Sequence, residues 1–338
     1  MIGTAKPASI QEIEGPIDAL HFAKMREANR PVVIRGLVKE WPAVAAGSQG
    51  GKAIAEYLIN CGSTRNVVAI AARPEEKGRF FYNSDMSGMN FMKGTGRLES
   101  FLTDLLRAAE IPDPPGMAIQ SEDIAELLPS FVRDNRLELL PDIPPRIWIG
   151  NRIRVAPHYD VKENVACCVA GRRQFTLFPP EQLANLYPGP FELTPAGTPV
   201  SMVDLANPDH AAYPRFEQAW AESSQATLEP GDAIYIPYCW WHGVESLDPV
   251  SILVNYWWNE GQPSGVGGPY DALLHAVMSY RHLPPAQREV WRMMLDYYVF
   301  ERGGDPGAHL PDHARGVLGP GSPGLFARMR EIIRGSLG

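Results

Sequence analysis

His158 and Asp160 place an imidazole and a carboxylate two positions apart in the sequence. On a β-strand, side chains two positions apart point to the same face, so this pair can bind a single metal ion. A second imidazole, His242, follows a Pro-Gly turn at 229–232 and a strand-like run at 233–237. Two imidazoles and one carboxylate form the ligand set of non-haem Fe(II) sites that keep coordination positions open. We therefore predict that His158, Asp160 and His242 form a catalytic metal centre.

Neither half of this ligand set is specific on its own. A His-x-Asp tripeptide is equally consistent with a satisfied surface or core pair. His242, which follows Trp240 and Trp241, is equally consistent with a histidine packed among aromatic rings. The metal prediction therefore depends on whether the fold brings the two segments together.

Short strand-like runs separated by Gly/Pro turns make up the region from 146 to 258, which contains both segments. This spacing is typical of an antiparallel β-sandwich or barrel. Before this region the chain mixes helical and strand patterns, and the Pro-rich stretch 141–145 predicts a boundary. The expected strands are 31–34, 64–72, 147–149, 164–170, 174–178, 233–236 and 251–258, and the expected helices are 17–29, 98–109 and 122–137.

Helical patterns return after Gly268, at 270–281, 286–301 and 322–335. The helix at 286–301 carries apolar residues on more than one face, so we expect it to be buried against the barrel or in a subunit interface. Most homo-oligomers are closed by such self-complementary interfaces. We therefore predict that the segment after 268 makes a homodimer.

Several longer motifs extend the pattern around the candidate ligands. They are HYDVKENVACCVAGRRQFTLFPP at 158–180, PGDAIYIPYCWWHGVES at 230–246 and SILVNYWW at 251–258, with looser matches RPVVIRGLVKEWPA at 30–43 and RFFYNSDMSGMNF at 79–91. In this order they resemble the cupin-like branch of the Jumonji-C oxygenases, and within it the asparaginyl hydroxylases. The resemblance covers residues from about 30 to 260.

The resemblance implies a mainly β fold, the double-stranded β-helix or jelly roll, with flanking helices. The chain would then contain an N-terminal α+β layer at 1–145 that completes the barrel, a catalytic core at 146–262 and a helical segment at 268–338. The implied activity is Fe(II)- and 2-oxoglutarate-dependent oxygenation, usually a hydroxylation, with release of succinate and carbon dioxide. Related hydroxylases also dimerise through C-terminal helices.

The same resemblance implies roles in binding the cosubstrate. Arg173 occupies the position where these hydroxylases usually carry a lysine for the distal carboxylate of 2-oxoglutarate, and a guanidinium can bind a carboxylate with two hydrogen bonds. Its neighbour Arg172 points to the opposite face of a strand and is expected to be solvated. Asn164 and Asn255 match positions beside the metal and the keto-acid end of the cosubstrate.

Four further positions bear on the same pocket. Val155 and Met117 stand where the relatives use hydroxyl-bearing residues to help hold the distal carboxylate, so either the cosubstrate would bind more weakly or its carboxylate site would be rebuilt around Arg173. Tyr82 and Gln120 either line the pocket or pack in the core. The resemblance around these two residues is loose and leaves both readings open.

Two other function classes stay open beside the oxygenase. One is a cupin metalloenzyme that does not use 2-oxoglutarate, and the other is a non-catalytic barrel that binds peptides or regulates a partner. Arg173 and Asn255 favour the oxygenase over the first class, and the complete His/Asp/His set disfavours the second. The expected substrate is a protein side chain or a small molecule.

Composition narrows the partners and the compartment. The 31 basic and 39 acidic residues give a formal net charge of -8, which disfavours a broad nucleic-acid-binding surface. The four cysteines show no Cys-x-x-Cys spacing, and Cys167 and Cys168 are interpreted as small buried strand residues. No secretory leader pattern and no apolar run of about eighteen residues is present, so we expect a soluble cytoplasmic protein.

Overall fold

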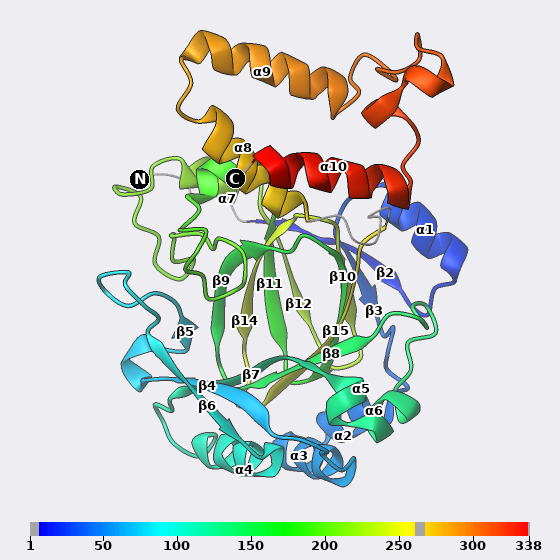
Figure 1. Cartoon of the computed structure of the whole chain (residues 1–338). Helices are drawn as coiled ribbons and strands as arrows, with labels where there is room; N and C mark the ends of the chain where they lie inside the picture. The colour runs from blue at the N-terminus through cyan, green and yellow to red at the C-terminus, as the bar shows by residue number, and fades with distance from the viewer. Residues whose placement is uncertain (1–6, 261–267, 337–338) are drawn as a thin grey trace. The chain divides into compact units, whose positions relative to one another are not determined.

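The computed structural model describes residues 7–260 and 268–336, and it divides the chain into two compact units after Asn259 (Figure 1). The predicted end of the catalytic core at 262 and the last two residues of the predicted helical segment lie outside the described residues. Each unit is described by itself below.

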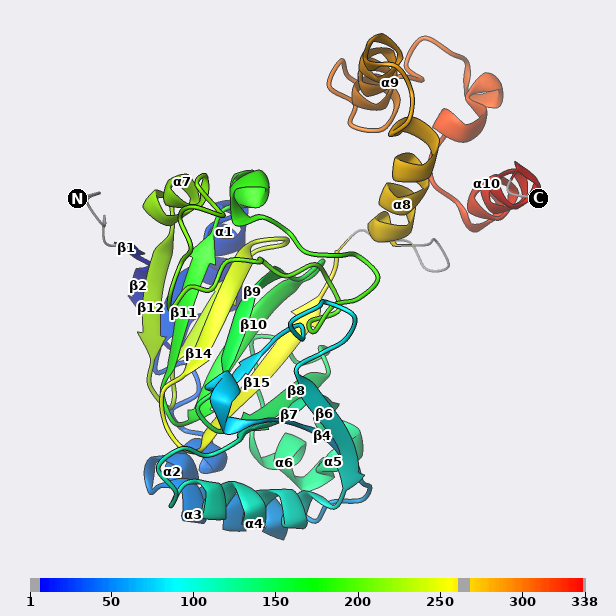
Figure 2. The same ribbon diagram turned by 90° about the vertical axis from the view of Figure 1, so that its left-hand side faces the viewer.

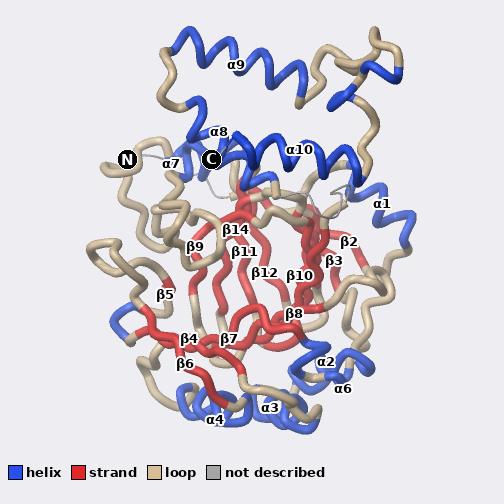
Figure 3. The backbone as a smooth tube through the Cα atoms, viewed as in Figure 1, coloured by secondary structure: helices blue, strands red, loops and turns tan. Residues whose placement is uncertain are grey.

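The first unit is built on two β-sheets that face each other (Figures 1 and 3). The six-stranded sheet has the order β1 (Ala8–Ser9), β12 (Ser224–Leu228), β11 (Arg173–Phe178), β14 (Trp241–Ser246), β9 (Arg154–Tyr159) and β5 (Arg79–Phe80). The nine-stranded sheet has the order β2 (Gln11–Glu14), β3 (Val32–Arg35), β13 (Ala233–Ile236), β10 (Glu163–Ala170), β15 (Ser251–Trp258), β8 (Pro145–Gly150), β7 (Gly116–Asp123), β4 (Val67–Ala72) and β6 (Phe91–Gly96). Most neighbouring strands are antiparallel, as a jelly roll requires.

Strand β10 is apolar at nearly every position because both of its faces are buried. Ala166 and Cys168 pack in the core between the two sheets, whereas Val165, Cys167 and Val169 pack in the core on the other face of the larger sheet. A strand that is buried on both faces needs apolar residues of both parities. The two facing, mostly antiparallel sheets confirm the double-stranded β-helix predicted from the sequence.

Helices cover the outer face of the larger sheet. The helices of this unit are α1 (Ala19–Glu27), α2 (Pro42–Ser48), α3 (Gly51–Asn60), α4 (Leu98–Ala108), α5 (Ile124–Leu127), α6 (Pro129–Asp134) and α7 (Phe216–Ala221), with the 3-10 helices η1 (Pro74–Glu76) and η2 (Pro180–Leu186). Helix α4 buries Leu98, Phe101, Leu102 and Leu105, the apolar stripe expected from their spacing. Gly47 of α2 lies so close to β10 that a Cβ atom there would be 2.3 Å from the Val169 carbonyl oxygen, so the helix packs directly on the sheet.

The helical stretch predicted near 122–137 consists of two short helices and is shorter than expected. Glu122 and Asp123 end strand β7, and the rest divides into α5 and α6 around Pro129. Proline lacks the N–H that would continue the first helix and disfavours helical geometry in the residue before it, here Leu128 with φ −136°.

The second unit contains three longer helices, α8 (Pro269–Tyr280), α9 (Pro285–Tyr298) and α10 (Pro323–Ser336), and two turns, η3 (Asp312–Ala314) and η4 (Gly316–Leu318). Tyr280 stacks on Trp291 with ring centroids 4.9 Å apart, which joins α8 to α9. Yet α9 contains no buried residue, and Trp291, Met294 and Tyr298 are 39%, 41% and 49% exposed. The unit itself therefore does not provide the burial predicted for this helix. No helix within the described residues combines the length and apolar character needed to cross a membrane.

Candidate metal centre and its cavity

The two predicted imidazole ligands lie side by side because β9 and β14 are neighbours in the smaller sheet (Figure 2). His158 pairs with His242 in the antiparallel register, and their ring centroids are 4.3 Å apart. The Oδ2 atom of Asp160 lies 3.6 Å from Nε2 of His242. One ligand atom from each of the three residues lies within 4.8 Å of the other two, so the sheet brings together the set that the sequence separates.

Backbone carbonyls orient both imidazole rings. Nδ1 of His158 lies 3.0 Å from the Ala156 carbonyl oxygen, and Nδ1 of His242 lies 3.1 Å from the Trp240 carbonyl oxygen. When Nδ1–H donates to these carbonyls, Nε2 carries the free lone pair that a metal needs. Burial, and to a lesser extent the neighbouring His242, lowers the pKa of His158 to about 4, which keeps this ring neutral.

The carboxylate reaches the centre from a loop. Strand β9 ends at Tyr159, so Asp160 lies one residue beyond it, yet its carboxylate joins the same cluster as His158, as the His-x-Asp spacing predicted. The Cys239 amide donates to the Asp160 carbonyl at 3.0 Å and holds the turn in place. Oδ2 of Asp160 is buried without a hydrogen-bond donor among the described residues. A buried carboxylate oxygen of this kind fits a bound cation, so the three residues suit a divalent metal.

These side chains open on a cavity of about 350 Å³ between the two sheets, which we call the central cavity. All six residues predicted to bind metal or cosubstrate line it, together with Val155 and Gln120. The remaining lining residues are Ser121, Trp148, Phe175, Pro195, Ala196, Val244, Leu253 and Trp257. Phe175 has the parity of Arg173 on β11, and Leu253 and Trp257 have the parity of Asn255 on β15, so strand alternation carries a sequence signal for these three.

Arg173 is a buried cation that lines the central cavity. Its side chain is aimed into the space between the sheets, Nε donates to the Ser251 hydroxyl at 2.8 Å, and no carboxylate of the described residues pairs with it. Burial lowers the pKa of Arg173 to about 10, so the guanidinium remains charged at neutral pH. Arg172, in contrast, is 48% exposed and pairs with Asp248 at 3.0 Å. Arg173 is thus buried and Arg172 exposed, as strand alternation predicts.

The two predicted asparagines are hydrogen-bonded to each other. Nδ2 of Asn255 on β15 donates to Oδ1 of Asn164 on β10 at 2.8 Å, and both residues are buried. The remaining amide oxygen of Asn255 has no donor among the described residues. The pair therefore leaves polar atoms available at the cavity wall.

Met117, expected beside the cosubstrate, lies outside the central cavity, and Tyr82 takes the core position that the sequence left open. Met117 does not line the central cavity; its side chain packs against the main core, and its amide donates to Oδ1 of Asn151 at 2.9 Å. Tyr82 packs with Phe81 and Val200 in a separate small cluster. Gln120 and Val155 do line the cavity. The loose resemblance around Met117 and Tyr82 could not fix which strand face enters the barrel.

Both adjacent cysteines are structural, as predicted. Cys167 and Cys168 are completely buried on opposite faces of β10, and Sγ of Cys168 lies 2.9 Å from the Gly171 carbonyl oxygen. Burial raises the pKa of Cys168 to about 12, which disfavours a reactive thiolate.

Comparisons with known proteins place this architecture in a family. The family model for the cupin-like domain matches residues 18–263. The human bifunctional peptidase and (3S)-lysyl hydroxylase JMJD7 is 28% identical over 283 residues, which cover 75% of this chain and 85% of that protein. The lysine-specific demethylase JMJ31 of Arabidopsis thaliana and the rat HSPB1-associated protein 1 are each 38% identical, over 35% and 33% of this chain.

The extent of these matches differs. The matched segments span only 21% of JMJ31 and 23% of HSPB1-associated protein 1, so those likenesses concern one part of longer proteins. The family model, by contrast, covers most of this chain and includes the complete His/Asp/His set and every strand of the two sheets except β1 and β2. The chain therefore belongs to the cupin-like domain family, as its motifs predicted, with Jumonji-C proteins among its relatives.

Proposed function

We propose that this protein is an Fe(II)- and 2-oxoglutarate-dependent oxygenase that hydroxylates its substrate. The observation that carries the proposal is that one cavity holds both a His/Asp/His cluster and a buried arginine with which no carboxylate of the described residues pairs. A metalloenzyme that does not use an anionic cosubstrate has no need for the second feature. A non-catalytic barrel has no need for either feature.

Each residue of the cavity has a separate task in this proposal. His158, Asp160 and His242 would hold the iron, with both imidazoles oriented through Nδ1 by backbone carbonyls. Arg173 would bind the distal carboxylate of 2-oxoglutarate and fix its orientation. Together the bound metal and cosubstrate would supply activation of dioxygen, with oxidative decarboxylation of 2-oxoglutarate to succinate and carbon dioxide. The apolar side chains of Val155, Phe175, Leu253 and Val244 would keep water from the reacting groups.

The proposed substrate is a protein side chain or a small molecule, and a protein is favoured by the relatives. JMJD7, which matches most of this chain, is named a lysyl hydroxylase, and HSPB1-associated protein 1 is named for a protein partner. The net charge of -8 continues to disfavour nucleic acid. A cytoplasmic location stays a prediction.

Succinate formation tests the class of enzyme. With Fe(II), ascorbate and 2-oxoglutarate, the wild-type protein is expected to convert 2-oxoglutarate to succinate slowly even without its substrate, and the Asp160→Ala variant is expected to form none. Quantitative ¹H NMR of both compounds measures the conversion. If 2-oxoglutarate neither binds nor turns over while the metal binds, the protein belongs to the alternative class of cupin metalloenzymes. If the metal does not bind either, the non-catalytic barrel is favoured.

We also propose that the second unit makes the homodimer predicted from the sequence. The exposed apolar side chains of α9 support this proposal, since a stable interface would bury at least about 1,200 Å² in total. Light scattering at micromolar concentration is expected to give twice the chain mass of 37.3 kDa. Trp291→Glu is expected to give the single-chain mass, whereas Ile59→Glu, an exposed apolar position of α3, should leave the dimer intact. A wild-type mass of one chain would refute the dimer.

A further inference from the structure

Strand β7 carries an extra residue opposite β8, beside the central cavity. Ile119 pairs with Ile149, but Glu122 pairs with Ile147, so three steps along β7 match two steps along β8. Such a bulge reverses the parity of the strand beyond it. Its position matters because β7 supplies two residues of the cavity wall.

The bulge determines which β7 side chains enter the cavity. Gln120 and Ser121, although adjacent in sequence, both line it. Glu122 instead lies opposite Ile147, whose side chain packs in the main core on the outer face of the sheet. A regular strand would send Glu122 to the inner face, opposite Arg146. The bulge therefore keeps a carboxylate out of the cavity.

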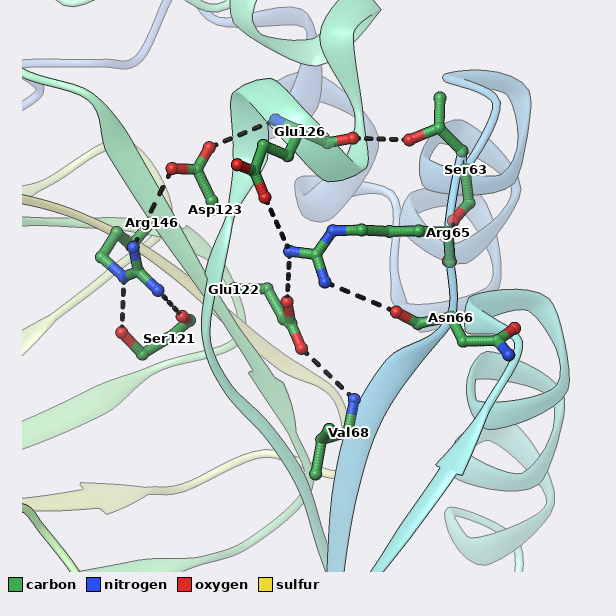
Figure 4. Close-up of polar contacts among 10 residues, drawn as sticks. Ser63, Arg65, Asn66, Val68, Ser121, Glu122, Asp123, Glu126 and Arg146 are labelled. Carbon is green, nitrogen blue, oxygen red and sulfur yellow. Dashed lines mark hydrogen bonds and ion pairs between the residues drawn. The ribbon is translucent and has the colours of Figure 1, made fainter.

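Arg146 holds the bulge from the inner side, as Figure 4 shows. Ser121 has φ +55°, a left-handed conformation that residues other than glycine rarely adopt. Nε of Arg146 donates to the Ser121 hydroxyl at 2.6 Å, and Nη2 donates to the Ser121 carbonyl oxygen. Nη1 lies 3.9 Å from Oδ2 of Asp123. The Arg146 side chain thus donates hydrogen bonds to two atoms of Ser121.

A second arginine holds Glu122 on the outer side (Figure 4). Nη2 of Arg65 donates to Oε2 of Glu122 at 2.7 Å, and the Val68 amide donates to Oε1 at 3.2 Å. Glu122 is only 8% exposed, so these contacts are needed to compensate its burial. Arginine side chains therefore stabilise the bulge on both faces of the sheet, Arg146 through Ser121 and Arg65 through Glu122.

We propose that Arg146 is a positioning residue of the central cavity. By holding Ser121 in the left-handed bulge, it keeps Gln120 and Ser121 in the wall and keeps the Glu122 carboxylate outside. The inference rests on the proposed function, because an inward Glu122 carboxylate would disturb the binding of an anionic cosubstrate and of the metal. The negative charge of Glu122 would repel the 2-oxoglutarate dianion and would compete with it for the guanidinium of Arg173.

The test is a double-mutant cycle of Arg146→Met and Glu122→Gln in the full chain. Titration of the Mn(II)-loaded protein with 2-oxoglutarate, followed by calorimetry, is expected to show affinity reduced on the order of tenfold in Arg146→Met. Glu122→Gln alone should change the affinity by less than about twofold, yet should restore most of it in the Arg146→Met background. Arg133→Met, at an exposed arginine paired with Asp134, is the matched control and should have no effect.

The rescue separates positioning from simple loss of charge. If Arg146 acted only through its own positive charge, Glu122→Gln would strengthen binding equally in both backgrounds, and the proposal would be overturned. An unchanged affinity in Arg146→Met would overturn it as well.

A second measurement does not depend on the cosubstrate. Hydrogen exchange at the Val68 amide, which donates to Glu122, is expected to become about tenfold faster in Arg146→Met and to stay unchanged in Arg133→Met. Exchange that does not change in Arg146→Met would count against the inference. If wild-type protein failed to bind 2-oxoglutarate, the proposed function would fall, while the exchange result would still decide whether Arg146 holds the bulge.

Discussion

Replacing His158 or His242 by alanine is expected to abolish stoichiometric binding of Mn(II), used as an air-stable substitute for Fe(II). Among the described residues three side chains form the candidate centre, and each imidazole supplies one of the three ligand atoms. Loss of a direct ligand should weaken binding by more than about a hundredfold, since even side chains that merely orient a ligand contribute ten- to hundredfold. Calorimetric titration and metal analysis after dialysis measure the loss.

His210→Ala is the matched control for these variants, because His210 is an exposed histidine 3.8 Å from Glu217 and does not belong to the cluster. It should retain one Mn(II) per chain. Full metal content in both His158→Ala and His242→Ala would exclude this site. Circular dichroism on the same samples separates loss of a ligand from loss of the fold.

Arg173→Ala is expected to raise the dissociation constant for 2-oxoglutarate by at least about a hundredfold while leaving Mn(II) binding unchanged. Removing one partner of a desolvated charge pair costs about 3–5 kcal/mol, and each 1.4 kcal/mol is about tenfold in affinity. The substitution should change the free energy of unfolding of the ligand-free protein little, because no carboxylate of the described residues pairs with Arg173. Titration of the metal-loaded variants measures both constants.

Arg172→Ala provides the control at the neighbouring position, just before β11, since Arg172 is half-exposed and pairs with Asp248. Its affinity for 2-oxoglutarate should match that of the wild type. Arg173→Lys retains the charge without the planar fork, so it should fall between wild type and Arg173→Ala. Equal affinities for Arg173→Ala and wild type would remove Arg173 from the cosubstrate site and weaken the proposed function.

The sequence alone identified the chemistry of the site through its local patterns. Strand alternation separated Arg173 from Arg172, and the spacing of apolar residues located the buried face of the helix at 98–108. The motifs around His158 and His242 indicated the fold and the ligand types. Such features depend on periodicity along a few residues, which a single sequence displays directly.

The tertiary structure decided how distant segments meet. It placed Asp160 in a loop beyond β9, moved Met117 and Tyr82 away from the central cavity, and introduced a bulge that turns Glu122 outward. These outcomes depend on the register between strands and on a single extra residue, which reverses the face of every following side chain. The sequence therefore determined which groups could perform the chemistry, whereas pairing between strands decided which of them share one cavity.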